Sequence, residues 1–264
     1  MTADAWVGML TLTLLFVLEG SMPFYAGRTD RLVHAGRNLG LALISGAVAV
    51  AATPLLMASA ATARSQGIGL CHWLDLGPWA SLVLVLVLFD LWMYAWHRLN
   101  HRIPLLWRLH RVHHTDIAMD STTALRFHPG EIALSMLANC LVLVALGMSF
   151  EAFVVYKSIM VAVILFHHSN VALPEAMDRA LRVAIVTPAV HRVHHSELRP
   201  ETDSNYGTIL SVWDRWLGSL RLRQDPEAIR FGIGSFAGAN WQRPWRLLAL
   251  PFVNAPAGTG RGER

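Results

Sequence analysis

The sequence has few cysteines and few charged residues. Its two cysteines, Cys71 and Cys140, lie far apart in different kinds of segment, so we expect neither a disulfide nor a cysteine metal site. Charged residues make up only 15% of the 264 positions and hydrophobic residues 54%, which is too apolar for an average soluble domain. The composition predicts one integrated, all-α, multi-pass membrane domain.

The signatures of several function classes are also missing. The sequence contains no His-Glu-x-x-His zinc-protease motif, no helix-turn-helix or zinc-finger pattern, and no Gly-rich dinucleotide fingerprint. It has no four-cysteine iron–sulfur set and no segment like cytochrome b5. We therefore relate its net charge of +4 to membrane orientation and lipid headgroups and not to nucleic acid.

Five apolar segments have the composition of membrane helices. Residues 5–25, 39–61 and 79–96 each reach or approach the roughly 20 apolar residues that cross a bilayer core. Residues 131–148 and 150–166 are shorter and are split by Gly-Met-Ser, which predicts a tight helical hairpin that crosses fully or dips partway. We expect four or five membrane helices.

The positions of the arginines predict how these helices are oriented. The first loop carries Arg28, Arg31 and Arg37, whereas the N-terminus and the loop at 64–78 are poor in positive charge. By the positive-inside rule the first loop is cytoplasmic. Alternation from there places every histidine cluster and the C-terminus on the cytoplasmic side, in what we expect to be a bacterial inner membrane.

Three histidine clusters follow or flank these apolar segments. On a helix, positions i, i+3 and i+4 lie on one side, so the histidines of each cluster point the same way. Imidazole suits iron, copper, nickel and zinc, and one metal seldom needs more than four protein ligands. Eight clustered histidines therefore predict two metal ions, with these ligands: His97, His101, His110, His113, His114, His191, His194 and His195.

Two other classes of membrane protein use clustered histidines and stay open as alternatives. A haem-binding electron-transfer protein needs axial ligands from opposing helices, which would leave most of these histidines unused. A metal-transport protein is expected to hold its ligands near the bilayer midplane and not at its boundary. The pattern favours an enzyme over both.

The order HxxxH, HxxHH, HxxHH resembles the signature of the fatty acid hydroxylase and sterol desaturase superfamily. The segments HHTDIAMDSTTALRFHPGE, HHSNVALP and TPAVHRVHHSELRPETDSNYG are similar to those of bacterial members labelled sterol desaturase family proteins. The resemblance covers about residues 80–225. It implies a histidine-ligated di-iron oxygenase that uses O2 and two electrons to hydroxylate or desaturate a fatty acyl, sterol or related lipid.

The resemblance adds further candidate ligands. It implies a ligand at His168, whose neighbour His167 points about 100° away on a helix and is a weaker candidate. It also implies a histidine at His128, where the following proline interrupts the helix, so ligation and a buried hydrogen-bonding role both stay open. The implied metal is iron, two ions per chain, although zinc can replace it in isolated protein.

A ligating imidazole normally donates its other N–H to a carboxylate or carbonyl. The candidates for this orienting role are Asp90, Glu131, Asn170 and Asp203, followed by Asp116, Asp120, Glu197 and Asn205. A carboxylate in an apolar span is costly unless it is paired, and Arg126 is a candidate partner. Lys157, the only lysine, is expected to extend to an interface.

The expected organisation is N-terminal transmembrane helices at 1–78, a catalytic region at 79–225, and an interfacial segment with a disordered tail at 226–264. Residues 102–109 and 241–252 are expected to lie in the membrane interface. Because no redox module is present, we expect a separate electron donor such as a ferredoxin or cytochrome with its reductase. Its expected docking surface is basic, formed by Arg108, Arg111, Arg192, Arg199, Arg221 and Arg223.

Overall fold

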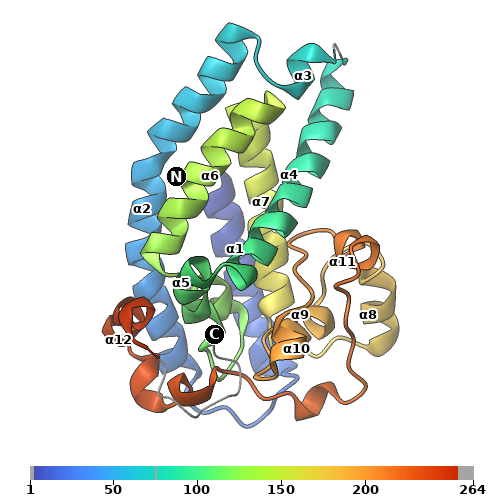
Figure 1. Ribbon diagram of the computed structural model, residues 1–264. Coiled ribbons are helices and arrows are strands. Elements are labelled where there is room, and N and C mark those ends of the chain that lie inside the picture. The colour runs from blue at the N-terminus through green and yellow to red at the C-terminus, as the bar shows by residue number, and fades with distance from the viewer. Residues whose placement is uncertain (1–2, 75, 255–264) are drawn as a thin grey trace.

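Long apolar helices form a bundle (Figure 1). The computed structural model describes residues 3–74 and 76–254, and within these ranges five helices are long and apolar enough to cross a membrane. They are α1 (Ala3–Ser21), α2 (Arg31–Gln66), α4 (Pro78–Arg102), α6 (Pro129–Leu146) and α7 (Phe150–His168). The described residues contain isolated β-bridges but no strand, so the prediction of an all-α, multi-pass fold is confirmed.

Local sequence signals set the ends of these helices. Proline occupies the first turn of α4 and α6, where its missing N–H costs nothing. Gly147 ends α6 at φ 66°, a left-handed conformation that glycine adopts without strain. The Ser149 side chain then accepts the N–H of Ala152 and begins α7. The predicted break between the two hairpin helices is therefore confirmed, although α6 packs mainly along α2 and α7 along α1.

Two of the membrane helices extend beyond their predicted ends. The 36 residues of α2 correspond to about 54 Å, well over the ~30 Å of a bilayer core. Its first turns carry buried polar side chains and pack against residues 115–127. Helix α4 continues from the predicted span to Arg102, so the first histidine cluster lies on a membrane helix.

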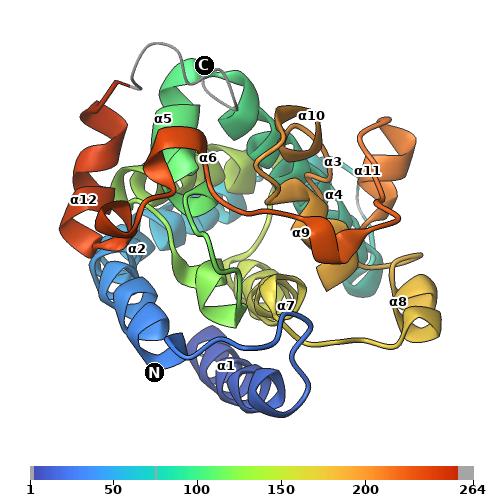
Figure 2. The ribbon, with the colours of Figure 1, turned by 90° about the horizontal axis from the view of Figure 1, so that it is seen from below.

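The shorter helices gather at one end of the bundle, apart from α3 (Leu70–Trp73) at the opposite end (Figures 1 and 2). We call this end the histidine end; α1, α4 and α7 finish there, and α2 and α6 begin there. Its helices include α5 (Pro104–His114), η1 (Ser121–Leu125), α8 (Glu175–Leu181), α9 (Pro188–His194), α10 (Arg199–Thr202), α11 (Val212–Trp216) and η2 (Pro226–Ala228). They continue with η3 (Gly234–Phe236), η4 (Ala239–Gln242), α12 (Pro244–Ala249) and η5 (Leu250–Phe252).

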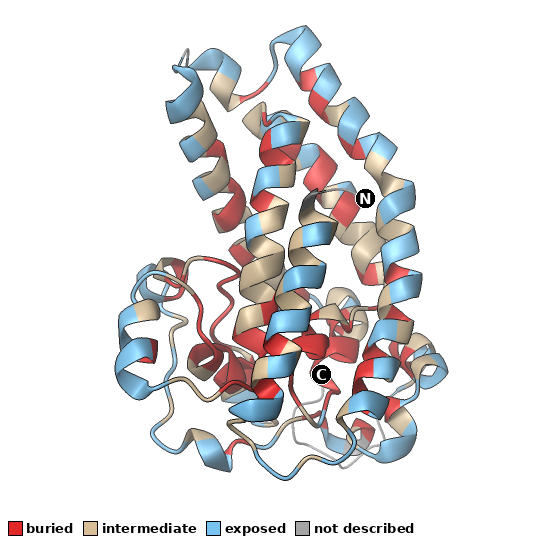
Figure 3. Ribbon diagram, turned by 180° about the vertical axis from the view of Figure 1, so that it is seen from behind, coloured by how far each residue is buried: buried red, intermediate tan, exposed pale blue. Residues whose placement is uncertain are grey.

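Burial differs between the bundle and the histidine end (Figure 3). The long helices expose large apolar side chains, such as Leu43, Val50 and Leu141, each more than 70% exposed. A soluble protein would bury them, whereas lipid solvates them at no cost. At the histidine end, by contrast, polar side chains are buried in large numbers.

The expected interfacial segments are only partly on the surface. Trp107 on α5 is buried with Leu247 and Leu250 in one apolar cluster, so the two segments pack on each other. Trp245 and Phe252 remain exposed and are available to an interface. The expected disordered tail, beyond residue 254, lies outside the described residues.

Lys157 and the cysteines also have defined surroundings. The Lys157 ammonium lies 2.9 Å from the Asp4 carboxylate on α1, so it forms an ion pair where we expected extension to an interface. Cys71 and Cys140 are both free thiols. The pair between Lys157 and Asp4 ties α1 to α7 within the span.

Candidate metal centre

Nine histidines converge at the histidine end from α4, α5, α7 and α9. Among the described residues, their potential ligand atoms form two groups, each with all its atoms within 4.8 Å of one another. The first group contains His97, His101, His110, His114 and His194. The second group contains His113, His168, His191 and His195. The eight histidines predicted from spacing and the ninth implied by resemblance are thus brought together.

Each HxxHH cluster is divided between the two groups. On α5, His110 and His114 join the first group and His113 the second. On α9, His194 alone joins the first group, and the other two histidines of the cluster join the second. Helix geometry explains the division, because positions i and i+4 are about 40° apart around the axis and i+3 and i+4 are about 100° apart.

Ring nitrogens within a group lie as close as ligands of a single ion. The Nε2 atom of His168 is 3.0 Å from Nε2 of His113 and of His191, and 3.2 Å from Nε2 of His195. In the first group, the Nε2 atoms of His110 and His114 are 3.3 Å apart. Two nitrogens bound at about 2.0–2.1 Å to one metal would be roughly 3.0–3.4 Å apart, so the spacing fits a metal.

Backbone carbonyls fix the tautomers of three of these histidines. The Nδ1 atom of His97 is 3.0 Å from the Tyr206 carbonyl, and that of His194 is 2.6 Å from the Ser204 carbonyl. The Nδ1 atom of His168 is 2.6 Å from the carbonyl of Ile164. A carbonyl can only accept, so each Nδ1 carries the proton and each neutral ring keeps its Nε2 lone pair for a metal.

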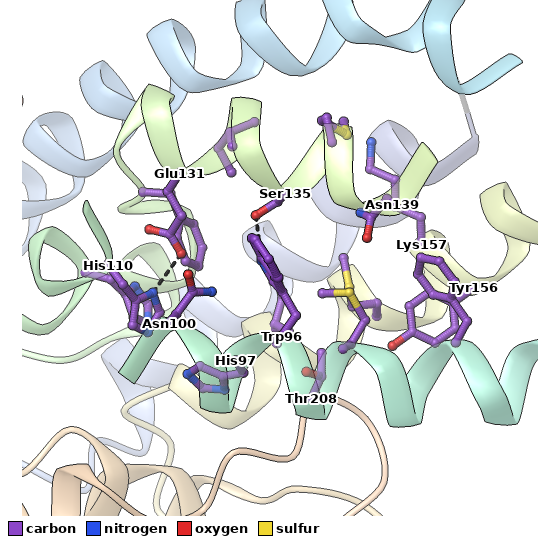
Figure 4. Close-up of a pocket in the computed structure, with 18 of the residues that line it drawn as sticks. Trp96, His97, Asn100, His110, Glu131, Ser135, Asn139, Tyr156, Lys157 and Thr208 are labelled. Carbon is purple, nitrogen blue, oxygen red and sulfur yellow. Dashed lines mark hydrogen bonds and ion pairs between the residues drawn. The ribbon is translucent and has the colours of Figure 1, made fainter. Parts of the chain in front are cut away.

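Glu131 orients a fourth histidine (Figure 4). Its Oε1 atom lies 2.7 Å from Nδ1 of His110, and both side chains are buried. This is the contact expected between a carboxylate and the outer nitrogen of a ligating imidazole. It leaves the His110 Nε2 lone pair directed at the first group.

Unpartnered nitrogens show that the site fits metal ions. The Nε2 atoms of His97 and His194 are buried and have no hydrogen-bond partner among the described residues. The same holds for both ring nitrogens of His101, whose Nδ1 is 3.7 Å from the Asp203 carboxylate. An unmet buried polar group costs about 1–3 kcal/mol, and a metal ion bound by these lone pairs would remove that cost.

Burial keeps the imidazoles beyond the membrane helices neutral. It lowers the pKa of His194 to about 3, against an opposing contribution from the Ser204 carbonyl. Burial is also the main cause that lowers the pKa of His113, His114, His191 and His195, with neighbouring histidines adding to it. Neutral imidazole is the form that binds a metal, so these ligands are ready at neutral pH.

His128 and His167 lie outside both groups. His128 begins α6: its Nδ1 accepts the N–H of Gly130, and its Nε2 lies 3.2 Å from the Leu248 carbonyl. This geometry supports the hydrogen-bonding alternative for His128. His167 is buried and stacks on His191 with ring centroids 4.0 Å apart, so its contact with the site is through a ring face.

Asp90, an expected orienting residue, has other partners. Asp90 accepts hydrogen bonds from Tyr156, Trp213 and the backbone at 209–210, so it anchors the loop whose carbonyl orients His97. Its expected contact with a ligating histidine is not found among the described residues.

Asn170 and Arg126 likewise serve other contacts. Asn170 bonds the backbone of Tyr25 in the loop between α1 and α2. Arg126, expected to pair with a carboxylate in an apolar span, is fully buried and donates instead to the Val112 carbonyl and to the side chains of Asn38, Thr115 and Gln242.

Sequence reasoning missed His34. Its Nδ1 lies 2.8 Å from Asp120 and its Nε2 2.8 Å from Asp116, so two carboxylates expected near the metal ligands hold this histidine instead. Asn38, one turn later on α2, also contacts Asp116. The available signal was this i, i+4 pair of polar residues at the start of an apolar helix. The hydrogen bonds of the pair join α2 to the segment after the second cluster.

Two of the six expected docking arginines are buried. Arg111 donates to two carbonyls of residues 250–253, and Arg192 donates to two carbonyls of residues 169–171. The expectation that these two side chains face a partner protein is therefore wrong. Both guanidinium groups support the backbone around the histidine groups.

An apolar cavity of about 240 Å³ leads from the bundle to the histidines (Figure 4). Helices α4, α6 and α7 contribute most of its walls, which include Phe89, Met93, Met136, Phe153 and Met160. Histidines of both groups line the part of the cavity at the histidine end of the bundle: His97, His110, His113, His168 and His191. The cavity can therefore hold an apolar molecule against the candidate metal centre.

Comparison with known proteins identifies this arrangement. Residues 82–219 match the fatty acid hydroxylase family. The chain belongs to this family. The matched region contains all nine histidines of the two groups, together with Glu131 and the helices that carry them apart from the first turn of α4. The protein is therefore an oxidoreductase of the lipid hydroxylase type, and its multi-pass membrane architecture agrees with that class.

Individual relatives are similar over different lengths. The chain is 29% identical over 233 residues to the ornithine lipid hydroxylase OlsE of Rhizobium tropici, which covers 86% of this chain and 70% of the relative. It is 27% identical to an alkylglycerol monooxygenase of Danio rerio and 26% identical to a cholesterol 25-hydroxylase of Rattus norvegicus. These matches cover 68% and 59% of this chain but only 42% and 51% of the relatives. No solved structure matches the chain.

Proposed function

We propose that this family member is a di-iron monooxygenase that hydroxylates a lipid held in the bundle cavity. The observation that carries the proposal is the pair of histidine groups, whose Nε2 atoms converge at 3.0–3.3 Å at the end of an apolar cavity. The overall reaction is R–H + O2 + 2 e⁻ + 2 H⁺ → R–OH + H2O. A protein that carries one electron at a time and is itself reduced by NAD(P)H supplies the electrons.

The residues of the chain have distinct tasks in this reaction. The first group would hold one iron ion and the second group the other, and bound iron supplies the activation of O2. Glu131 and three backbone carbonyls hold the imidazole rings in the tautomer that presents Nε2. The apolar cavity walls exclude water from the reacting carbon.

The proposal specifies iron as the metal and hydroxylation as the reaction. Imidazole ligands alone do not distinguish iron from zinc, copper or nickel, so family membership is the support for iron. The printed names of the relatives are hydroxylases and monooxygenases, which supports hydroxylation over desaturation. Those names also support a lipid with a polar or sterol portion as the substrate.

The geometry argues against the two alternatives, a haem-binding electron-transfer protein and a metal-transport protein. Axial nitrogens of a haem lie about 4 Å apart on opposite sides of the iron, twice a metal–nitrogen bond, which is longer than the 3.0 Å separations here. A transporter is expected to hold metal near the middle of its spans. Both histidine groups lie instead where α4 and α7 end.

We also propose that the histidine end faces the cytoplasm of a bacterial inner membrane. The loop with Arg28 and the start of α2 with Arg31 lie at the histidine end, so the positive-inside rule places these arginines and the histidine groups on the same side (Figure 1). The 79–225 region then forms the catalytic part of one integrated domain. Residues before it supply α1 and α2, and residues after it pack against α5.

The electron donor is proposed to dock near a small cleft that reaches His101 from the protein surface. Trp107, Thr202 and Asp203 line this cleft together with the exposed side chain of Arg199, which forms an ion pair with Asp203. Arg221 is exposed as well, so an acidic carrier would find basic groups close by. Turnover that depends on an added ferredoxin or cytochrome and falls with salt supports this docking, whereas sustained turnover from NAD(P)H alone refutes it.

The test of the function is oxygen incorporation. Cells with and without the gene are grown in 18O2, and their lipids are compared by mass spectrometry. The proposal expects a lipid that gains one 18O atom only when the gene is present. A lipidome unchanged by the gene, in cells where the protein is made and loaded with iron, would refute the hydroxylase proposal.

A further inference from the structure

The lengths of α6 and α7 place the histidine groups at a membrane boundary. These helices have 18 and 19 residues, which correspond to about 27–29 Å and just span a bilayer core of ~30 Å. Gly147 between them therefore lies at one boundary, and Pro129 and His168 lie at the other. The boundary is the level of lipid headgroups and of the first carbons of their chains.

The cavity runs from this boundary into the span. Its lining residues on α7 extend from His168 back to Lys157 and Phe153, and His168 and Lys157 are eleven residues or about 16 Å apart along the axis. The lining between these ends is largely apolar. A lipid lying in its normal orientation would thus place its tail along the cavity and its polar portion beside the histidines.

Unmet polar atoms occur at the histidine end of the cavity (Figure 4). The Oδ1 atom of Asn100 and the Oε2 atom of Glu131 are buried and have no hydrogen-bond partner in the part of the chain that the structure describes. Both residues line the cavity, and the residues are 3% and 4% exposed. Two buried acceptors that border a binding cavity require donors, which a ligand can supply.

The polar groups deeper in the cavity are already paired. The Asn139 oxygen accepts the Trp92 indole N–H, and the Ser135 oxygen accepts that of Trp96. Lys157 is paired with Asp4 on α1. The contrast between this satisfied inner part and the unmet acceptors beside the histidines gives the cavity a direction.

We infer that the substrate is a membrane lipid whose oxidised carbon lies next to a hydrogen-bond donor, either a hydroxyl or an amide N–H. Asn100 accepts that donor, and the acyl or alkyl tail follows the cavity toward Phe153. Oxygen therefore enters the head-proximal part of the lipid and not the middle or the end of its tail. The inference rests on the proposed hydroxylase function. Its reaction is the balanced one given above, in which R–H is now the C–H bond beside the donor.

The position of the inserted oxygen tests the inference first. Tandem mass spectrometry of the 18O-labelled lipid assigns the label to a fragment. Label in the headgroup, the backbone or the first carbons of a chain supports the inference. Label in the middle or at the end of a chain overturns it while leaving the hydroxylase function intact, and the absence of any labelled lipid overturns both.

Binding to the metal-free protein tests Asn100 without any turnover. The probes are hexadecyl glycerol ether and its dimethyl ether for the hydroxyl arm, and N-hexadecanoyl glycine and its N-methyl counterpart for the amide arm. We expect at least one donor-bearing probe to raise the melting temperature and to bind about tenfold or more tightly than its methylated partner. Whichever arm shows this preference identifies the donor; equal binding of both members in both arms overturns the inference.

Matched variants assign the preference to a residue. Asn100→Leu should bind both members of a pair equally, because its acceptor is gone. Asn139→Leu makes the same change deeper in the cavity and should keep the wild-type ratio between donor and methylated probes. If Asn100→Leu keeps that ratio, Asn100 is not the acceptor and the inference is wrong. Because the wild-type comparison uses probes alone, the test stands even if Asn100→Leu fails to fold.

Discussion

Removing the Glu131 carboxylate should release one metal ion and spare the other. Glu131 contacts His110, a member of the first group, and in Glu131→Ala the buried Nδ1–H of His110 loses its acceptor. Loss of such an orienting partner typically lowers metal affinity about 10- to 100-fold, which corresponds to about 1.4–2.8 kcal/mol. This range agrees with the ~1–3 kcal/mol that an unmet buried donor costs.

The second group provides an internal reference for this variant. Among the described residues, Glu131 forms no hydrogen bond with a second-group histidine, and the tautomer of His168 is held by a carbonyl of α7. Titration with a chelator, followed by elemental analysis, should therefore show one weakened ion and one unchanged ion per chain. Glu131→Gln keeps an oxygen that can accept the His110 N–H and should lose less affinity than Glu131→Ala.

A matched control separates this effect from helix electrostatics. Glu151 lies in the first turn of α7 as Glu131 lies in the first turn of α6, but it is exposed and at the opposite end of the bundle. Both glutamates interact favourably with a helix N-terminus, so Glu151→Ala reproduces that loss alone. If Glu131→Ala and Glu151→Ala retain metal equally well, the orienting role of Glu131 is refuted.

Three further predictions follow from the same arrangement. His113→Ala and His194→Ala should each lose activity and about one metal ion, from the second and first group respectively, measured by elemental analysis; full metal content with full activity in either variant would contradict the grouping. The metal-free protein should lose stability as pH falls from about 6.5, because burial lowers the pKa of the site histidines in the folded state, to about 3 for His194. Between the folded-state and unfolded-state pKa values the unfolded chain binds more protons than the folded protein, so acid favours unfolding. A melting temperature unchanged between pH 7 and 5 would count against buried neutral ligands. In a Cys71→Ser background, an impermeant thiol reagent outside intact cells should label Gln66→Cys and not Gln224→Cys, and the reverse result would invert the proposed topology.

The lengths of the apolar segments predicted the membrane helices, and the i, i+3, i+4 spacing predicted the histidine clusters, because both signals are local. Helix spacing separates His113 from His110 and His114, but which of them meet the histidines of α9 depends on how α5 and α9 face each other, and spacing along the chain does not contain that information. His34 illustrates the same limit, since its two carboxylate partners lie more than eighty residues away. Asp90 was chosen for its burial in an apolar span, and that burial is real, but its partners come from the distant segment 209–213.

The arginines show where reading charge as surface fails. Arg111 and Arg192 follow the first histidine of the two HRVHH clusters, and both were expected on the basic docking surface. Both helices are instead covered on their other side, α5 by residues 250–253 and α9 by the segment after α7, whose backbone carbonyls accept the guanidinium N–H groups. Buried carbonyls of irregular segments need donors, and arginine can supply several at once.

The number of iron ions per chain tests the central claim most directly. The purified protein is reconstituted with ferrous iron without oxygen, freed of excess metal, and analysed for iron together with its X-ray absorption spectrum. Two histidine groups predict about two ions per chain, each bound by nitrogen and light oxygen donors with no sulfur. A protein that is folded but binds one ion or none, or whose iron has sulfur ligands, would contradict the account.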